Sequence, residues 1–334
     1  MAFNIGMFSL AELTQSINLI PFKYGRLVNS GIFTLKPINT RTVMLERQHN
    51  ILRLLTTKPL GAPGTPSEHG KRDSLSFKVP HMPLTDVILP NEYEGVRAFG
   101  TENQLDTQQS VMLRKLAENR LKFEITWEHM HWGAIKGLIL DGDGSSVIYN
   151  LFDEFDLTQT VLDFELDDPN TDVAEKCRDL SRYIELNLEG DVTTGTRVFV
   201  SPEFFDSLIT HASVKEWYRN WTAAAQMSQV DPRKGFTFGG VTFEECLGQA
   251  TTSKGATTRY IAAGEGHAIP EGTMSTFETV AAPGNFTDTV NTYGEMLYAL
   301  SKLRDFNQGV DIWMESNILP LCYRPKLLVK VKRY

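Results

Sequence analysis

The stretch that decides the fold runs from Gln104 to Ile139 and reads QLDTQQSVMLRKLAENRLKFEITWEHMHWGAIKGLI. It contains no proline, and its glycines, Gly133 and Gly137, come only near its end. Apolar residues in this stretch are three, four or seven positions apart and so share one side of a helix, while charged residues fill much of the remainder. These apolar residues are Met112, Leu116, Phe123, Trp127, Met130, Ala134 and Leu138. At about 1.5 Å per residue the helix would be roughly 50 Å long. The pattern predicts a spine helix over residues 104–139, against which the other parts pack.

Composition limits the classes of protein that fit. With 334 residues, 41% of them hydrophobic, the chain can form a sizeable core divided between two domains. A net charge of −8 argues against a surface built to neutralise phosphate groups. The three cysteines are widely spaced, with no CxxC pair, which favours reduced core thiols. We expect no signal peptide, because the opening MAFNIGMFSL has no basic region followed by a long apolar run. We expect no membrane partner, because no segment approaches the roughly 20 apolar residues of a span.

The first 49 residues have the pattern of an arm. Ser9 and Glu12 form a capping-box pattern that predicts a short opening helix. The following residues read as extended segments interrupted by proline and glycine, with little apolar content of their own. Such a segment needs another surface to lie on, and that surface could belong to another subunit. The candidate contact residues in the arm are Phe22, Tyr24 and Arg26.

Residues 50–85 predict an extended β-hairpin loop. Two strand-like runs, Ile51–Thr57 and Ser74–Val79, flank the connector KPLGAPGTPSEHGKRD, which is rich in proline and glycine. An isolated two-stranded hairpin is marginally stable in water, so we expect this one to lie on a neighbouring subunit. Its candidate contact residues are the charged ones of the connector: Lys58, Lys71, Arg72 and Asp73.

The remaining sequence predicts two domains. Asp141–Gly144 (DGDG) is typical of a hairpin turn. Residues 160–290 read as a compact α/β-like block, with a strand at Arg197–Val200, a helix capped by Ser201 and a further core strand at Arg259–Ala263. The segment PEGTMSTFETVAAPGNFTDTVN (270–291) is expected to be loop-rich and largely irregular. Strands in the tail, including one at Leu327–Lys332, are expected to rejoin the spine. This gives a discontinuous domain (86–159 and 291–334) with the continuous 160–290 block inserted into it.

No residue pattern predicts a catalytic, cofactor-binding or metal site. In the EHMH motif, His129 and His131 would point about 200° apart on a helix and could not chelate one ion, so a solvated helix face is the favoured interpretation. The acidic run Asp163–Asp168 has no spaced partner base or electrophile. A metal-dependent hydrolase that uses this run is the alternative from another functional class.

Several segments, taken in order, resemble the major capsid protein E family of tailed, lambda-like bacteriophages. SLAELTQSINLIPF (9–22) resembles the opening helix of that family, and VRAFGTEN (96–103) the entry to its spine. KGLILDGDGSSVIYNLFDEFD (136–156) is similar to its spine-to-hairpin passage. AAPGNFTDTVNTYGEMLYA (281–299) and MESNILPLCYRPKLLVKV (314–331) resemble its closing segments. The resemblance covers nearly the whole chain.

The resemblance implies an α+β, HK97-like capsid fold. Its parts would be an N-terminal arm (1–49), an extended loop (50–85), a peripheral domain with the spine helix (86–159 and 291–334) and an axial domain (160–290). It further implies a virion protein made in the host cytoplasm, without enzymatic activity or cofactor, whose pentamers and hexamers enclose double-stranded DNA without sequence-specific binding. Scaffold, decoration and portal proteins are expected partners. Another virion component, such as a portal, tail or decoration protein, is the alternative.

Overall fold

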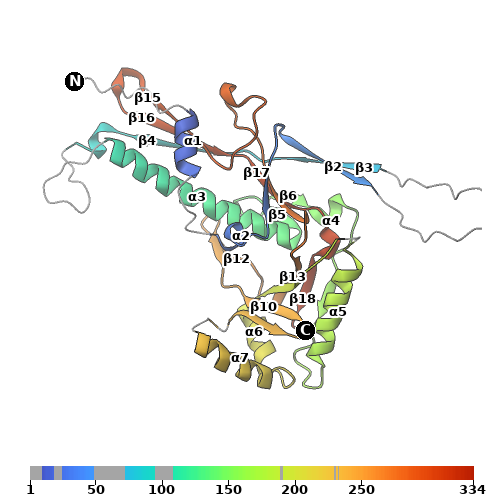
Figure 1. The fold of residues 1–334 in the computed structure, drawn as a ribbon. Helices are drawn as coiled ribbons and strands as arrows, with labels where there is room; N and C mark the ends of the chain where they lie inside the picture. Colours follow the sequence, from blue (N-terminus) through green and yellow to red (C-terminus); the bar gives the residue numbers. More distant parts are fainter. Residues whose placement is uncertain are drawn as a thin grey trace, which may run out of the picture.

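The structure is a computed structural model that describes residues 10–18, 25–48, 72–94, 108–188, 191–228, 231 and 233–334. Its longest element is helix α3, Gln108–Lys136, which crosses the upper half of the molecule (Figure 1). The predicted spine helix is confirmed over residues 108–136, while residues 104–107 of the prediction lie outside the described residues. Six of its seven predicted apolar positions are buried: Met112, Leu116, Phe123, Trp127, Met130 and Ala134. Leu138, the seventh, begins strand β5 (Leu138–Leu140) instead.

Gly137 ends the spine. Its φ of +77° lies in the left-handed region, and a Cβ built on it would come within 2.2 Å of the ring of Phe152. Glycine is the residue that adopts this conformation without steric cost. The chain then turns back through β5 and β6 (Val147–Asn150), which pair in the hairpin predicted around Asp141–Gly144 and lead into helix α4 (Leu151–Glu154).

The spine is buried over a wider face than its apolar residues predict. Arg120 and Glu124, one turn apart, form an ion pair of 2.9 Å and are each 1% exposed. Glu128 and His131 are buried as well, so the prediction that EHMH forms a solvated helix face was wrong. Both side chains have polar partners inside the protein, which is how a polar group can be buried at low cost.

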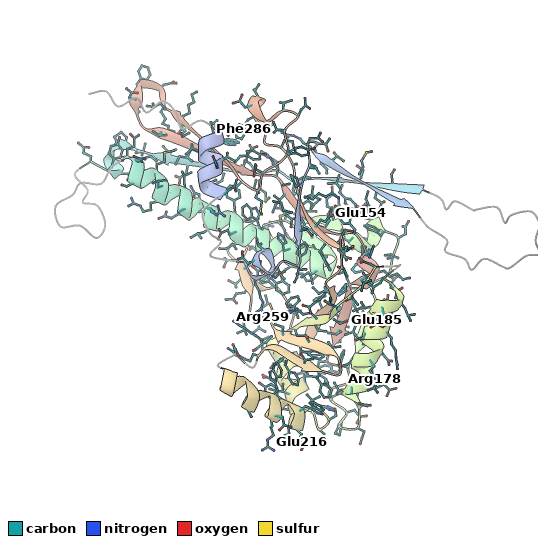
Figure 2. The ribbon with its side chains drawn as sticks, in the orientation of Figure 1. Glu154, Arg178, Glu185, Glu216, Arg259 and Phe286 are labelled. Carbon is teal, nitrogen blue, oxygen red and sulfur yellow. The ribbon has the colours of Figure 1, made fainter. Side chains whose placement is uncertain are left out.

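A six-stranded sheet forms the core of the lower half. Its strand order is β7-β18-β13-β8-β10-β9, and helices α5 (Val173–Leu186), α6 (Pro202–Thr210) and α7 (Lys215–Ser228) lie against it. Ser201 caps α6 as predicted, by accepting a hydrogen bond from the backbone N–H of Phe204. Figure 2 shows charged side chains, among them Arg178, Glu185 and Glu216, on the outer surfaces of α5 and α7. The strands are Val161–Asp163 (β7), Gly195–Val200 (β8), Lys234–Phe238 (β9), Val241–Glu245 (β10), Glu265–Glu271 (β13) and Val329–Lys332 (β18).

Two three-stranded sheets pack along the spine. One has the order β15-β16-β4, with strands Tyr298–Leu303, Val310–Ser316 and Met82–Ile88. Helix α1 (Leu10–Asn18) lies against β15 and buries Leu13 and Ile17, which confirms the predicted opening helix. The other has the order β1-β14-β17, with strands Thr34–Pro37, Phe277–Ala281 and Ile318–Cys322. Further elements are the β11–β12 hairpin (Gln249–Thr251 and Thr257–Arg259) and 3-10 turns at Pro90–Glu92, Thr287–Thr289, Asp305–Asn307 and Pro325–Leu327.

Several strand predictions need correction. Strand β3 (Arg72–Lys78) pairs with β2 (Thr42–Gln48), so the first hairpin strand comes earlier than predicted; Ile51–Thr57 lies outside the described residues. Arg259–Ala263 is not a core strand, because β12 ends at Arg259 and is exposed. Residues 270–291, predicted to be largely irregular, also contain β14, a mostly buried strand that was not predicted. The final strand, β18, forms but pairs with β13 and β7 of the six-stranded sheet.

Candidate subunit-contact surfaces

The described part of the N-terminal arm is fixed to its own chain by helix α2 (Arg26–Asn29). Leu27 of this helix is fully buried in the main core. Its backbone N–H donates to both carboxylate oxygens of Glu128, at 3.1 and 3.0 Å, and the Nε1–H of Trp132 donates to Oε1 of the same group at 2.9 Å. The carboxylate of Glu128 in the spine thus accepts hydrogen bonds from the N-terminus of α2, which has no side-chain cap of its own. Burial raises the pKa of Glu128, and these hydrogen bonds oppose that shift.

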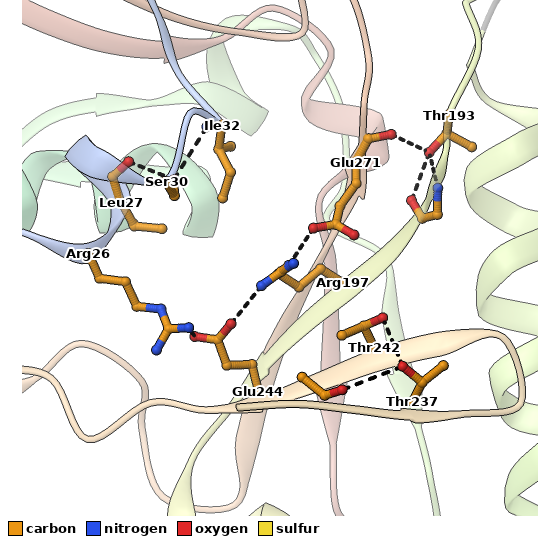
Figure 3. Close-up of polar contacts among 12 residues, drawn as sticks. Arg26, Leu27, Ser30, Ile32, Thr193, Arg197, Thr237, Thr242, Glu244 and Glu271 are labelled. Atoms are coloured by element: carbon orange, nitrogen blue, oxygen red, sulfur yellow. Dashed lines mark hydrogen bonds and ion pairs between the residues drawn. The ribbon is translucent and has the colours of Figure 1, made fainter. Parts of the chain in front are cut away.

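A chain of alternating charges connects the arm to the six-stranded sheet (Figure 3). Arg26 of α2 forms an ion pair with Glu244 of β10. Glu244 also accepts from Arg197 of β8 at 2.7 Å, and Arg197 in turn pairs with Glu271 of β13. Glu244 is 1% exposed, whereas the side chain of Arg26 is 43% exposed. The arm therefore contacts both the spine, through Glu128, and the six-stranded sheet, through Glu244.

Arg26 lines two cavities. The first, of about 500 Å³, is mainly apolar and lies between the spine and the segment that follows β10; its lining includes Ile125, Trp132, Leu247 and Tyr260. The second, of about 590 Å³, is more polar and is lined by Asn29, Arg197, Lys234 and Glu271, among others. These hollows mark the junction between the upper and lower halves of the molecule.

The β2–β3 hairpin is anchored at one end and projects at the other (Figure 1). Near its base, Phe77 is buried and its ring contacts those of Tyr149 and Phe155. The hydroxyl of Tyr149 both accepts from the N–H of Lys78, at 2.7 Å, and donates to its carbonyl oxygen, at 3.0 Å. Farther out, Met44 is 75% exposed. The base of the hairpin belongs to the core, while its outer part presents surface to solvent.

The structure describes some of the predicted contact residues and not others. Arg72 and Asp73 lie in β3, where the strand register places them opposite Gln48 and Arg47 of β2. Arg26 has a partner in its own chain. Four other candidates lie outside the described residues: Phe22, Tyr24, Lys58 and Lys71.

Of the polar residues at the junction, the sequence analysis singled out Arg26 as a contact candidate, but it assigned no role to Glu128 or Glu244. Glu128 stands in a helix rich in charged residues, and Glu244 follows the apolar Phe243 as a solvated strand residue would. The position of α2, which no local pattern predicts, gives each carboxylate its partner in the arm. Long-range contacts of this kind leave no periodic signal in the sequence.

The acidic run Asp163–Asp168 does not form a cluster. Phe164 and Leu166 are buried between acidic neighbours, which spreads the carboxylates apart. The carboxylates of Asp163 and Asp168 accept hydrogen bonds from backbone N–H groups within two residues. Within the described ranges, no three His, Cys, Asp or Glu side chains come together as metal ligands. No described helix is both long enough and apolar enough to cross a membrane.

Residues 9–333 match the model of a family described as phage major capsid protein E. The chain belongs to this family. It is 29% identical to the major capsid protein of Salmonella phage Felix O1 over 358 residues, covering 97% of this chain and 96% of that one. It is 30% identical to the major capsid protein of Pseudomonas phage KPP10 over 344 residues, covering 97% of each.

Solved structures show the same fold at low sequence identity. The putative capsid protein of an E. coli CFT073 prophage has a TM-score of 0.58 and 13% identity, covering 97% of this chain and 98% of that one. A chain of the capsid of cyanophage P-SCSP1u has a TM-score of 0.51 and 11% identity, covering 94% of this chain and 90% of that one. The α+β, HK97-like fold is thereby confirmed. The protein is a major capsid protein of a tailed phage, forms the capsid shell and belongs to the virion.

Proposed function

We propose that this major capsid protein assembles into pentamers and hexamers, which close an icosahedral head around double-stranded DNA. The observation that carries the proposal is the family match over residues 9–333, which leaves almost no part of the chain for another role. The net charge of −8 suits a container, because a shell of like charge does not bind the genome tightly while DNA enters. The protein would be made in the host cytoplasm and act without enzymatic activity.

The proposed parts of the subunit follow the family. Residues 1–49 would be the arm, 50–85 the extended loop, 86–159 and 291–334 the peripheral domain, and 160–290 the axial domain around the five- and six-fold axes. We propose one change to these bounds: the last strand, β18, is counted with the axial domain, because it pairs with β13 and β7 of the six-stranded sheet. Scaffold, portal and decoration proteins are the proposed partners during assembly.

The proposed function requires contacts between subunits, and we propose the projecting hairpin as one of them. Its base is fixed by Phe77 and Tyr149, so the outer part can be held out toward a neighbour without unfolding the subunit. The candidate residues there are Lys58, Lys71, Arg72 and Asp73. In the arm, Phe22 and Tyr24 are proposed contacts, and Arg26 is proposed to act within its own subunit.

A charge reversal in the loop tests this contact. We expect Lys71→Glu with Arg72→Glu to reduce the yield of assembled particles at least tenfold, because the reversed charges would repel the acidic surface of a neighbour. The melting temperature of the unassembled subunit should stay unchanged. The matched control, Lys71→Arg with Arg72→Lys, keeps both charges and should assemble normally. Sedimentation velocity measures the amounts of assembled particles and of unassembled subunits. Normal particle yield from the reversed variant would contradict the contact.

A further inference from the structure

The turn that joins β15 to β16 exposes a large aromatic side chain. Phe306 is 94% exposed. Its φ is +60° and that of Asn307 is +58°, so two consecutive residues other than glycine adopt the left-handed conformation. For a bulky side chain this conformation is a genuine outlier, and it persists only where the surrounding structure imposes it. Backbone strain of this kind is concentrated at functional sites, so the turn is a candidate contact site.

The surrounding structure does impose this conformation. Arg304 closes the turn through its backbone: its N–H donates to Gly309 at 3.0 Å, and its carbonyl oxygen accepts from Asn307 at 3.2 Å. Gly309 has a φ of +124°, and a Cβ there would come within 2.4 Å of the carbonyl oxygen of Ile88 in β4. The turn is therefore held against the neighbouring strand, and Phe306 stays extended into solvent.

A hollow of about 260 Å³ lies beside the exposed ring. It is lined by this same hairpin: Lys302, Leu303, Arg304, Asp305, Phe306, Gln308 and Asp311. Arg304 and Asp311 pair across it at 2.7 Å. Lys302 and Asp305 have no ion-pair partner within the described part of the chain. The tip thus carries a projecting ring, a hollow large enough for a ring, and unpaired charges of both signs.

We propose that this tip, residues 302–311, is a self-complementary contact between copies of the subunit. Phe306 of one copy would enter the hollow beside Phe306 of the next, and Lys302 of one copy would face Asp305 of the other. A knob and a hollow on the same turn cannot fill each other within one chain, whereas copies related by a rotation axis can exchange them in a closed set. The tip lies at the far end of the molecule from α7, where a neighbour can reach it (Figure 1). This inference rests on the proposed assembly.

Phe306→Asn separates a contact role from a structural one. Asparagine adopts the left-handed conformation readily, so the substitution removes the ring and relieves the turn. We expect the protein concentration needed for assembly to rise about tenfold, as for loss of an interface anchor. The melting temperature of the unassembled subunit should be unchanged or higher. Light scattering over a concentration series, with thermal unfolding of the unassembled subunit, measures both.

Charge variants at the same tip provide a second test. Lys302→Glu and Asp305→Lys should each weaken assembly, because each places like charges opposite one another. The double variant, Lys302→Glu with Asp305→Lys, restores opposite charges and should recover assembly. Assembly of Phe306→Asn at the wild-type concentration, or a double variant as weak as the sum of its singles, would overturn this inference while leaving shell formation intact. A wild-type chain that never assembles would instead overturn the proposed assembly, and this inference with it.

Discussion

At the scale of single residues, buried polar groups connect parts of the subunit that lie far apart in sequence. His131 of the spine is one of them. Its Nδ1 lies 2.6 Å from the carbonyl oxygen of Trp127 and therefore donates the proton, while Nε2, 2.8 Å from the hydroxyl of Thr279 in β14, accepts one. The sequence could not predict this role, because helical spacing shows which side of a helix is apolar and not how far burial extends around it.

This burial predicts an acid-sensitive subunit. Burial lowers the pKa of His131 from 6.5 to about 4, so the folded state resists a proton that the unfolded chain accepts below pH 6.5. The contribution of neutral His131 to the free energy of unfolding is complete above pH 6.5 and is lost as the pH falls toward 4. At pH 5 the free energy of unfolding is lower by about 2 kcal/mol for this reason. His131→Gln should reduce the loss of unfolding free energy between pH 7 and 5 by that amount. Urea unfolding of the unassembled subunit measures it, and an equal loss in both proteins would contradict the assignment.

The Arg26–Glu244 ion pair gives a second residue-scale prediction. Glu244→Ala removes a buried partner of two arginines and should cost about 2 kcal/mol of unfolding free energy. Because the Arg26 side chain is 43% exposed, solvent screens the pair, and we expect a coupling energy of about 1 kcal/mol between Arg26→Ala and Glu244→Ala. A double-mutant cycle measures this energy. Strictly additive effects would mean that the pair does not hold the arm to the six-stranded sheet.

At the scale of elements, signals local in sequence predicted structure well. The cap at Ser201, the turn at Asp141–Gly144 and the 3.6-residue period of the spine each depend on residues close together in the sequence, and each was confirmed. Strand β13, which reads EGHAIPE, was missed because it is buried on both faces and lacks alternation. The surrounding strands, not its own residues, make it a strand.

The end of the spine gives an element-scale prediction. Gly137→Ala forces a side chain into a left-handed conformation and against the ring of Phe152, so we expect a loss of about 2 kcal/mol of unfolding free energy. Gly142→Ala, in the following turn, is the matched control: a Cβ there meets open space, and stability should change by less than about 0.5 kcal/mol. Denaturant unfolding compares the two, and equal effects would show that Gly137 does not determine where the helix ends.

At the scale of the whole molecule, the sequence predicted the fold through the order of its segments. No single motif carried that identification; the opening helix, the spine, the DGDG turn and the closing strands did so together. The resemblance could not show how the arm docks. That depends on a spine carboxylate, Glu128, and on Glu244 of β10, whose roles become visible only when these elements meet in space.

The central claim is that this chain closes an icosahedral shell from pentamers and hexamers. Cryo-electron microscopy of the purified chain, expressed alone and together with its scaffold, tests it most directly. We predict closed particles in which five-fold vertices are separated by six-fold capsomers, with the β2–β3 hairpin of each subunit lying on a neighbour. Particles with a single ring symmetry, or a subunit that stays monomeric under every condition, would contradict the account.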